Sequence, residues 1–171
     1  REYGYDLEAL ARATGPQTKV VYLANPNNPT GTLFTAIEFD EFLRNVPEDV
    51  VVVLDEAYYD YVERADYSRS IERVKEGRNL LVLRTFSKVY GLAGLRIGYA
   101  VGPAVLVEHL NKVRSPFNTS LVAQAAALAA LDDSEHVRRS GESNRAGRKQ
   151  LGEGLKALGG QVVPSYGNFL L

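Results

Sequence analysis

The stretch that decides the fold is Asn79-Leu80-Leu81-Val82-Leu83-Arg84-Thr85-Phe86-Ser87-Lys88, which begins apolar and ends in hydroxyl and amine groups. Its apolar half has the length and composition of a buried strand. An amine becomes a useful nucleophile toward an aldehyde when its geometry is fixed and its charge is suppressed, and the end of a buried strand supplies both conditions. Lys88 is therefore a candidate for forming a Schiff base. The alternative, a solvated loop lysine, is the commoner situation for this residue type.

Groups that suit a phosphate flank this lysine. The hydroxyls of Thr85 and Ser87 precede it, and the guanidinium of Arg96 follows at the end of a glycine-containing run. Hydroxyls and a guanidinium fork are common donors to phosphate oxygens. An amine directed at an aldehyde, beside a phosphate site, points to pyridoxal phosphate as the cofactor.

Two further apolar runs of strand length also end in polar groups. Residues 20–24 lead into Asn25-Pro26-Asn27-Asn28-Pro29-Thr30-Gly31, and residues 50–54 lead into Asp55-Glu56-Ala57-Tyr58. In an open parallel sheet, ligands bind just beyond the carboxyl ends of the strands. We therefore expect Asn28, Asp55 and Lys88 to meet at one site.

Composition sets the broad class of the protein. The 171 residues are 45% hydrophobic and carry a net charge of −1, so they can build a core and give no electrostatic case for nucleic acid or an anionic membrane. Small molecules are the expected partners. No apolar run approaches the length of a membrane span, and the absence of cysteine is a weak indication of the cytoplasm. His109 and His136 lack ligand partners at metal spacing, so no metal site is expected.

The order of apolar and polar runs predicts an α/β fold with a mostly parallel sheet and flanking helices. Strands are expected over 19–24, 50–54, 79–84 and 96–102, and helices over 6–13, 36–44, 71–75, 103–113, 121–131 and 134–158. The fourth strand follows the third too closely for a parallel crossover, so it should run antiparallel.

Helix caps and faces give finer expectations. Asp6 and Thr35 should cap the first two helices, and Asn118 or Thr119 the helix at 121–131. That helix is apolar nearly all round and is expected to be buried between elements. In helix 36–44, the apolar face should contain Ile37, Phe39, Phe42 and Leu43. Residues 161–164 and 169–171 look like pieces of strand. The lack of methionine and the apolar end of the sequence suggest a fragment of a longer protein.

Four motifs carry a resemblance to a known family. They are NPNNPTG at 25–31, LDEAY at 54–58, RTFSKVYGLAGLRIGY at 84–99 and VRSPFNTSLVAQAAALAAL at 113–131. In this order and spacing the chain resembles fold type I pyridoxal-phosphate aminotransferases, most closely the histidinol-phosphate aminotransferases. The resemblance implies that residues 1–133 form a cofactor-binding large domain, incomplete at its N-terminus. Residues 134–171 would be the connecting helix and the truncated start of a smaller α+β domain.

The resemblance also implies roles for individual residues. Lys88 matches the lysine that binds the cofactor aldehyde and later shuttles the substrate's Cα proton. Asp55 matches the carboxylate at the pyridine nitrogen, and Asn28 and Tyr58 match the residues that bind the phenolic oxygen. Phosphate-holding positions are matched by Thr85, Ser87 and Arg96.

The activity implied is transamination between histidinol phosphate and 2-oxoglutarate in histidine biosynthesis, by a cytoplasmic homodimer that binds amino-acid and 2-oxo-acid substrates. The alternatives are another class I/II aminotransferase, a phosphothreonine decarboxylase, or a non-catalytic truncated domain. A fragment that lacks the substrate-binding arginine and the N-terminal phosphate loop of the family is expected to be a weak or inactive catalyst.

Two features have simpler interpretations. The glycine-rich run at 91–98 departs from nucleotide-binding spacings and is expected to be structural. Glu56 stands beside Asp55, but adjacent strand residues point to opposite faces, so only one of the two carboxylates should face the cofactor.

Overall fold

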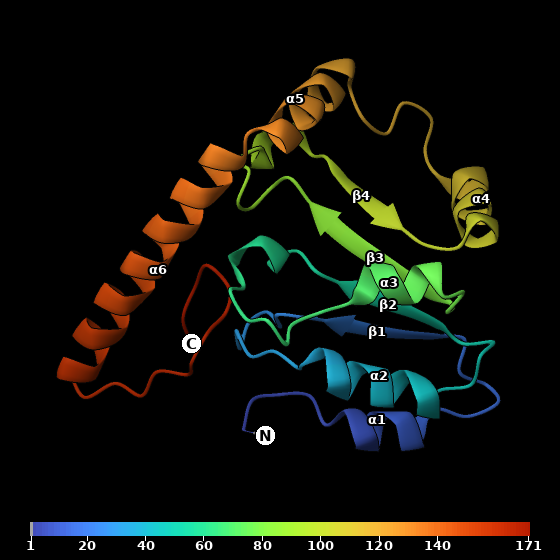
Figure 1. Cartoon of the computed structure of the whole chain (residues 1–171), viewed down its shortest axis with the longest axis horizontal. Coiled ribbons are helices and arrows are strands. Elements are labelled where there is room, and N and C mark those ends of the chain that lie inside the picture. Colours follow the sequence, from blue (N-terminus) through green and yellow to red (C-terminus); the bar gives the residue numbers. More distant parts are fainter. Residues whose placement is uncertain (1) are drawn as a thin grey trace.

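A four-stranded sheet with strand order β1-β2-β3-β4 organises the protein, as seen in a computed structural model that describes residues 2–171 (Figure 1). Its strands are β1 (Val20–Ala24), β2 (Val51–Asp55), β3 (Leu80–Thr85) and β4 (Gly98–Val101). The first three strands are parallel, and β4 runs antiparallel to β3. The predicted sheet, including its antiparallel strand, is confirmed.

Three helices cover one face of the parallel strands. They are α1 (Leu7–Ala13), α2 (Ala36–Asn45) and α3 (Ser70–Lys75). Alternate strand residues point into the core with them, and this buried set includes Leu23, Leu54, Leu80 and Val82. On the opposite face, Val20 and Tyr22 are more than half exposed. One face of the sheet is therefore covered by helices, and we call the opposite face, which is exposed at β1 and buried at Leu81 of β3, the open face.

The predicted caps of α1 and α2 are confirmed. The Asp6 side chain accepts a hydrogen bond from the Ala9 amide at 2.8 Å. Thr35 and Glu38 form a reciprocal capping box at the start of α2. The expected apolar face of α2 is wrong at Ile37, which is 73% exposed. Ile37 is the second residue of α2, and its side chain points away from the sheet. The side chains of Phe39, Phe42 and Leu43 pack in the core against the sheet.

The remaining helices are α4 (Ala104–Val113), α5 (Leu121–Asp132) and α6 (Ser134–Ala157), which follow β4; α5 lies beyond β4, and α6 runs back past the sheet toward the C-terminal loop (Figure 1). The predicted burial of α5 is wrong. Only Ala123 and Ala127 of α5 are buried, and Leu121, Val122 and Leu128 are more than two-thirds exposed. Because burial needs a neighbouring surface as well as an apolar sequence, α5 stays open where no described segment packs on it. Its cap is Ser120, whose hydroxyl accepts from the Ala123 amide, in place of the predicted Asn118 or Thr119.

The long charged helix was predicted correctly and is continuous over 24 residues despite its glycines. On its exposed face, Arg138 pairs with Glu135 and Glu142. The segment after α6 contains no strand within 158–171, so the strands expected at 161–164 and 169–171 are not formed. One hydrogen bond, from the Val163 amide to the Leu171 carbonyl at 2.8 Å, closes this segment into a loop. Within residues 2–171, no helix has both the length and the apolarity needed to cross a bilayer.

Candidate active site

The carboxyl ends of β1, β2 and β3 lie next to one another at one edge of the sheet. Ala24 of β1 pairs with Asp55 of β2, and Asp55 pairs with Leu83 of β3. Because the three strands are parallel, the segments that follow them leave from the same edge. The sequence-predicted residues Asn28, Asp55 and Lys88 all come from these ends, as expected.

Asp55 closes β2 on the open face of the sheet. Its Oδ1 accepts a hydrogen bond from the Ala57 amide at 3.0 Å, and its Oδ2 accepts one from the Tyr22 hydroxyl at 2.6 Å. Partial burial and the bond to Asp55 raise the pKa of Tyr22 to about 12. These two donors fix the plane of the carboxylate and leave further lone pairs on both oxygens for a ligand.

Tyr22 is a residue that the sequence analysis missed. Strand alternation could have identified it, because Tyr22 lies on the same face as Ala24, and Ala24 is the register partner of Asp55. A tyrosine two residues before that partner is within reach of the carboxylate. Because Tyr22 lies within an apolar run, it was interpreted only as a residue of the strand.

Tyr58 is the centre of the site. Its side chain is buried, and its hydroxyl accepts a hydrogen bond from the Asn28 side-chain amide at 2.9 Å. The Lys88 Nζ lies 5.2 Å from the centroid of the same ring, within the range of a cation–π contact. Residues from the ends of all three parallel strands thus meet on one tyrosine.

The other side of Tyr58 is held by the C-terminal segment. The ring of Phe169 packs edge-on against it, with centroids 5.2 Å apart and an angle of 77° between the planes. This segment also meets the 25–31 loop, because the Tyr166 amide donates to the Gly31 carbonyl at 2.8 Å. Gly31 has φ +73°, and a Cβ there would lie 2.2 Å from the Ser165 Oγ, so this contact requires glycine. Gly31 thus permits both the left-handed backbone of this loop and its close contact with the C-terminal segment.

The predicted phosphate-holding residues are divided between two places. The Thr85 hydroxyl accepts a hydrogen bond from the Ser87 amide at 3.1 Å, which shapes the turn between β3 and Lys88. Phe86 is buried between Tyr90 and Tyr99 and anchors this turn. Arg96 is exposed, has φ +54° and donates to the Ala93 carbonyl at 2.9 Å. The structure therefore brings Thr85 and Ser87 together and leaves Arg96 turned toward its own helix end.

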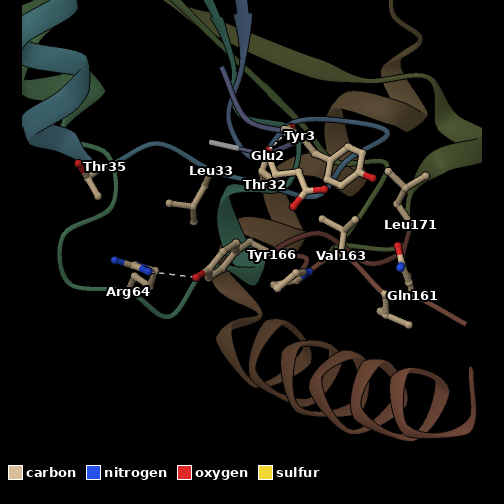
Figure 2. A pocket seen from close by; sticks show the side chains of 12 residues that line it. Glu2, Tyr3, Thr32, Leu33, Thr35, Arg64, Gln161, Val163, Tyr166 and Leu171 are labelled. Atoms are coloured by element: carbon tan, nitrogen blue, oxygen red, sulfur yellow. Dashed lines mark hydrogen bonds between the residues drawn. The ribbon is translucent and has the colours of Figure 1, made fainter. Parts of the chain in front are cut away.

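Two cavities lie away from these strand ends. One of about 700 Å³ is formed by the segment after Thr32 and the C-terminal loop, where Arg64 donates a hydrogen bond to the Tyr166 hydroxyl (Figure 2). Another of about 700 Å³ lies between α1 and α2. Neither is lined by a predicted site residue. At the strand ends, Tyr58 is buried, Lys88 is half-buried and Asn28 is exposed.

The chemistry of the site fits a flat aromatic aldehyde with a phosphate. A carboxylate on the open face suits a ring nitrogen, and the Asn28–Tyr58 pair suits a phenolic oxygen. The Lys88 amine lies beside that pair, within reach of an aldehyde on the same ring. No cluster of three or more potential metal ligands occurs in the described part of the chain.

Comparison with known proteins agrees with this geometry. The family model for aminotransferase class I and II matches residues 1–171. Histidinol-phosphate aminotransferase 1 of Cupriavidus pinatubonensis is 54% identical over 171 residues, which are all of this chain and 46% of that protein. Histidinol-phosphate aminotransferase 2 of Ralstonia nicotianae is 53% identical with the same shares. The chain thus spans about half the length of the curated relatives it matches.

Solved structures give the same result. The crystal structure of histidinol-phosphate aminotransferase from Sinorhizobium meliloti in complex with pyridoxal-5'-phosphate has a TM-score of 0.90 and 37% identity, covering 96% of this chain and 45% of that one. Aspartate aminotransferase from Thermus thermophilus with maleate has a TM-score of 0.84 and 31% identity, covering 98% and 45%. The expected α/β fold of this group is confirmed, and the chain belongs to the class I and II aminotransferase family.

Proposed function

We propose that the protein is a pyridoxal-phosphate-dependent aminotransferase, which transfers the amino group between histidinol phosphate and 2-oxoglutarate in histidine biosynthesis. The observation that carries this proposal is Tyr58, which contacts Asn28 and Lys88 from two other strand ends and follows Asp55, the last residue of β2. The identity of 54% to a histidinol-phosphate aminotransferase supports the choice of substrate.

In this proposal, the cofactor when bound supplies an electron sink for the carbanion that forms as the substrate loses its Cα proton. Asp55 keeps a proton on the ring nitrogen, and Asn28 and Tyr58 donate hydrogen bonds to the phenolic oxygen. The Lys88 amine would hold the cofactor through its aldehyde carbon. The same amine would serve as the general base and general acid for the substrate's Cα proton.

Three residues hold the cofactor phosphate in this proposal. Thr85 and Ser87 already share one turn after β3. Arg96 would supply the guanidinium fork, of which one terminal nitrogen donates a hydrogen bond to the Ala93 carbonyl.

The proposed organisation follows the family. Residues 1–133 form the cofactor-binding domain, and residues 134–171 form a connecting helix and the start of a smaller domain. The two parts meet at the site, since Phe169 packs on Tyr58. We further propose a cytoplasmic homodimer with amino-acid and 2-oxo-acid substrates.

A second candidate is a class I/II aminotransferase with a different amino-acid substrate. The Thermus aspartate aminotransferase, at a TM-score of 0.84, shows that the same core serves another substrate. A panel of amino donors with and without an imidazole ring distinguishes the two candidates. Conversion of histidinol phosphate well above aspartate supports the first, and the reverse order supports the second.

The cofactor proposal is tested by absorbance after adding pyridoxal phosphate. A covalent link to Lys88 gives a band at the edge of the visible range, and borohydride removes the band while fixing the cofactor on the protein. Lys88→Ala should abolish the band. Lys149→Ala is the matched control, because Lys149 is an exposed lysine on α6, and it should leave the band unchanged. A band that survives in Lys88→Ala would refute the assignment.

A further inference from the structure

A buried polar cluster lies directly behind the site, on the covered side of the sheet. We call it the rear cluster, and it consists of Glu56, Tyr59, Ser68 and Arg84. The Glu56 side chain is fully buried, and its Oε2 accepts hydrogen bonds from the Arg84 Nε and a terminal nitrogen at 3.1 and 2.9 Å. Its Oε1 accepts from the Ser68 hydroxyl. The Arg84 guanidinium lies 3.5 Å from the centroid of the Tyr59 ring. Every charged group of the cluster is thus partnered.

The cluster stands where backbone pairing between β2 and β3 stops. Their last paired residues are Asp55 and Leu83, and the Glu56 amide makes a final bond to the Leu83 carbonyl at 2.9 Å. The proposed site residues Tyr58, Thr85 and Lys88 lie beyond this point. Glu56 and Arg84 are therefore the side-chain link between two chain segments that no longer share a backbone ladder.

Members of the rear cluster are chain neighbours of the site residues. Glu56 follows Asp55, Tyr59 follows Tyr58, and Arg84 precedes Thr85. At the ends of β2 and β3, successive side chains point to opposite faces, so a contact of Glu56 or Arg84 on the covered face fixes the backbone from which Asp55 or Thr85 leaves on the open face. Tyr58 and Tyr59 lie just beyond β2, at the start of a short 3-10 helix. The cluster is thus placed to set the separation of Asp55, Tyr58 and Thr85.

A contribution to stability does not by itself explain the buried Glu56–Arg84 ion pair. Burial opposes the charge of Arg84, and Glu56 overcomes that effect and raises the arginine's pKa above its ordinary value. Apolar residues of similar volume often stabilise a fold as well as a buried ion pair does. What an apolar pair lacks is the fixed geometry of a guanidinium that donates two hydrogen bonds to a carboxylate.

We propose that Glu56 and Arg84 form a positioning pair, which holds the ends of β2 and β3 in the register that the cofactor site requires. This inference rests on the proposed function, because the register matters through cofactor binding. Neither residue touches the cofactor in this account. Both act through Asp55, Tyr58 and the turn that leads to Lys88.

The test compares Glu56→Gln with Asp40→Asn. Asp40 forms the same kind of two-bond pair with Arg73, at 2.6 Å for both bonds, between α2 and α3 and away from the strand ends. We expect both variants to lower the melting temperature. Glu56→Gln alone should weaken pyridoxal-phosphate binding, by about tenfold, the factor that corresponds to one lost charged hydrogen bond. Equal weakening in Asp40→Asn would overturn the proposal.

A double variant separates positioning from stability. Glu56→Gln combined with Arg84→Met removes the unpaired charge, so the melting temperature should recover while cofactor affinity stays low. If affinity recovers together with melting temperature, the pair is only structural and the proposal fails.

A cofactor-free measurement distinguishes this proposal from the proposed function. Amide hydrogen exchange in residues 56–61 and 84–90 should quicken in Glu56→Gln and stay unchanged in Asp40→Asn. If the wild-type protein binds no pyridoxal phosphate, the proposed function fails, and quickened exchange still supports the ordering role of the pair. Unchanged exchange in Glu56→Gln contradicts that role whatever the cofactor result.

Discussion

The two faces of the sheet differ in what their residues do, although the same strands supply both. On the covered face, Leu23, Leu54 and Leu80 are fully buried under the three helices. On the open face, Tyr22 and Asp55 form a hydrogen bond in reach of solvent. Because strand side chains alternate between the two faces, a residue that packs in the core can be the immediate neighbour of one that faces the site. Apart from the rear cluster, substitutions on the covered face should change mainly stability, and substitutions of the charged groups on the open face should change mainly cofactor chemistry.

The largest expected effect is on the open side of this comparison. Lys88→Ala should reduce transamination by at least roughly 10²–10⁴-fold, the contribution of a general acid–base group, because it removes the amine that lies over the Tyr58 ring. Its free energy of unfolding should stay within about 0.5 kcal/mol of wild type, because Lys88 is half-buried and lies in a turn. Steady-state kinetics and denaturant unfolding measure the two quantities. A large loss of unfolding free energy in Lys88→Ala, together with the loss of activity, would contradict the difference between the two faces.

The covered side is tested by Leu54→Ala. Leu54 is completely buried in the centre of the core, so the change should lower the free energy of unfolding by about 2–5 kcal/mol. Ile37→Ala is the matched control, because this isoleucine is 73% exposed, and it should change stability by about 0.5 kcal/mol or less. Urea unfolding of both variants provides the measurement. A large effect at Ile37 would show that another surface covers α2.

A smaller effect is expected at the start of α2. Thr35→Ala removes the acceptor for the Glu38 amide and half of the capping box, which should cost about 1 kcal/mol. Thr35→Ser keeps the hydroxyl and should retain most of that stability. Chemical denaturation measures both variants. Equal losses in the two would show that the threonine methyl group, and not the cap, is responsible.

The smallest effect is a dependence on alkaline pH from the open face. Partial burial and the bond to Asp55 raise the pKa of Tyr22 from 10.0 to about 12. A raised pKa in the folded state means that the folded protein binds the proton more tightly, so this contribution is complete below pH 10 and is lost as pH rises toward 12. Unfolding free energies measured from pH 9 to 12 should fall less steeply in Tyr22→Phe. An unchanged slope would mean that Tyr22 ionises alike in both states.

Local rules predicted the parts of the structure that depend on neighbours in sequence. Asp6 and Thr35 cap their helices as expected, because a cap involves residues three positions apart. The antiparallel β4 followed from the short link after β3. The opposite orientations of Asp55 and Glu56 followed from strand alternation, and Glu56 is indeed buried.

The features that depend on distant segments were less predictable. Burial of α5 was expected from its apolar sequence, but apolarity does not say whether another segment packs there. Tyr22 and Phe169 reach the site through a register and a loop contact that involve residues far along the chain. The rear cluster was likewise hidden, since the pairing of Glu56 with Arg84 joins residues 28 positions apart. The motifs predicted which residues belong to the site. The contacts that position those residues became visible only in the tertiary structure.

The most direct test of the account is a crystal structure of the protein with pyridoxal phosphate. The account predicts electron density continuous with the Lys88 Nζ, with the ring nitrogen at Asp55 and the phenolic oxygen at Asn28 and Tyr58. Cofactor bound elsewhere, for example in the cavity beside Arg64 and Tyr166, would contradict it (Figure 2).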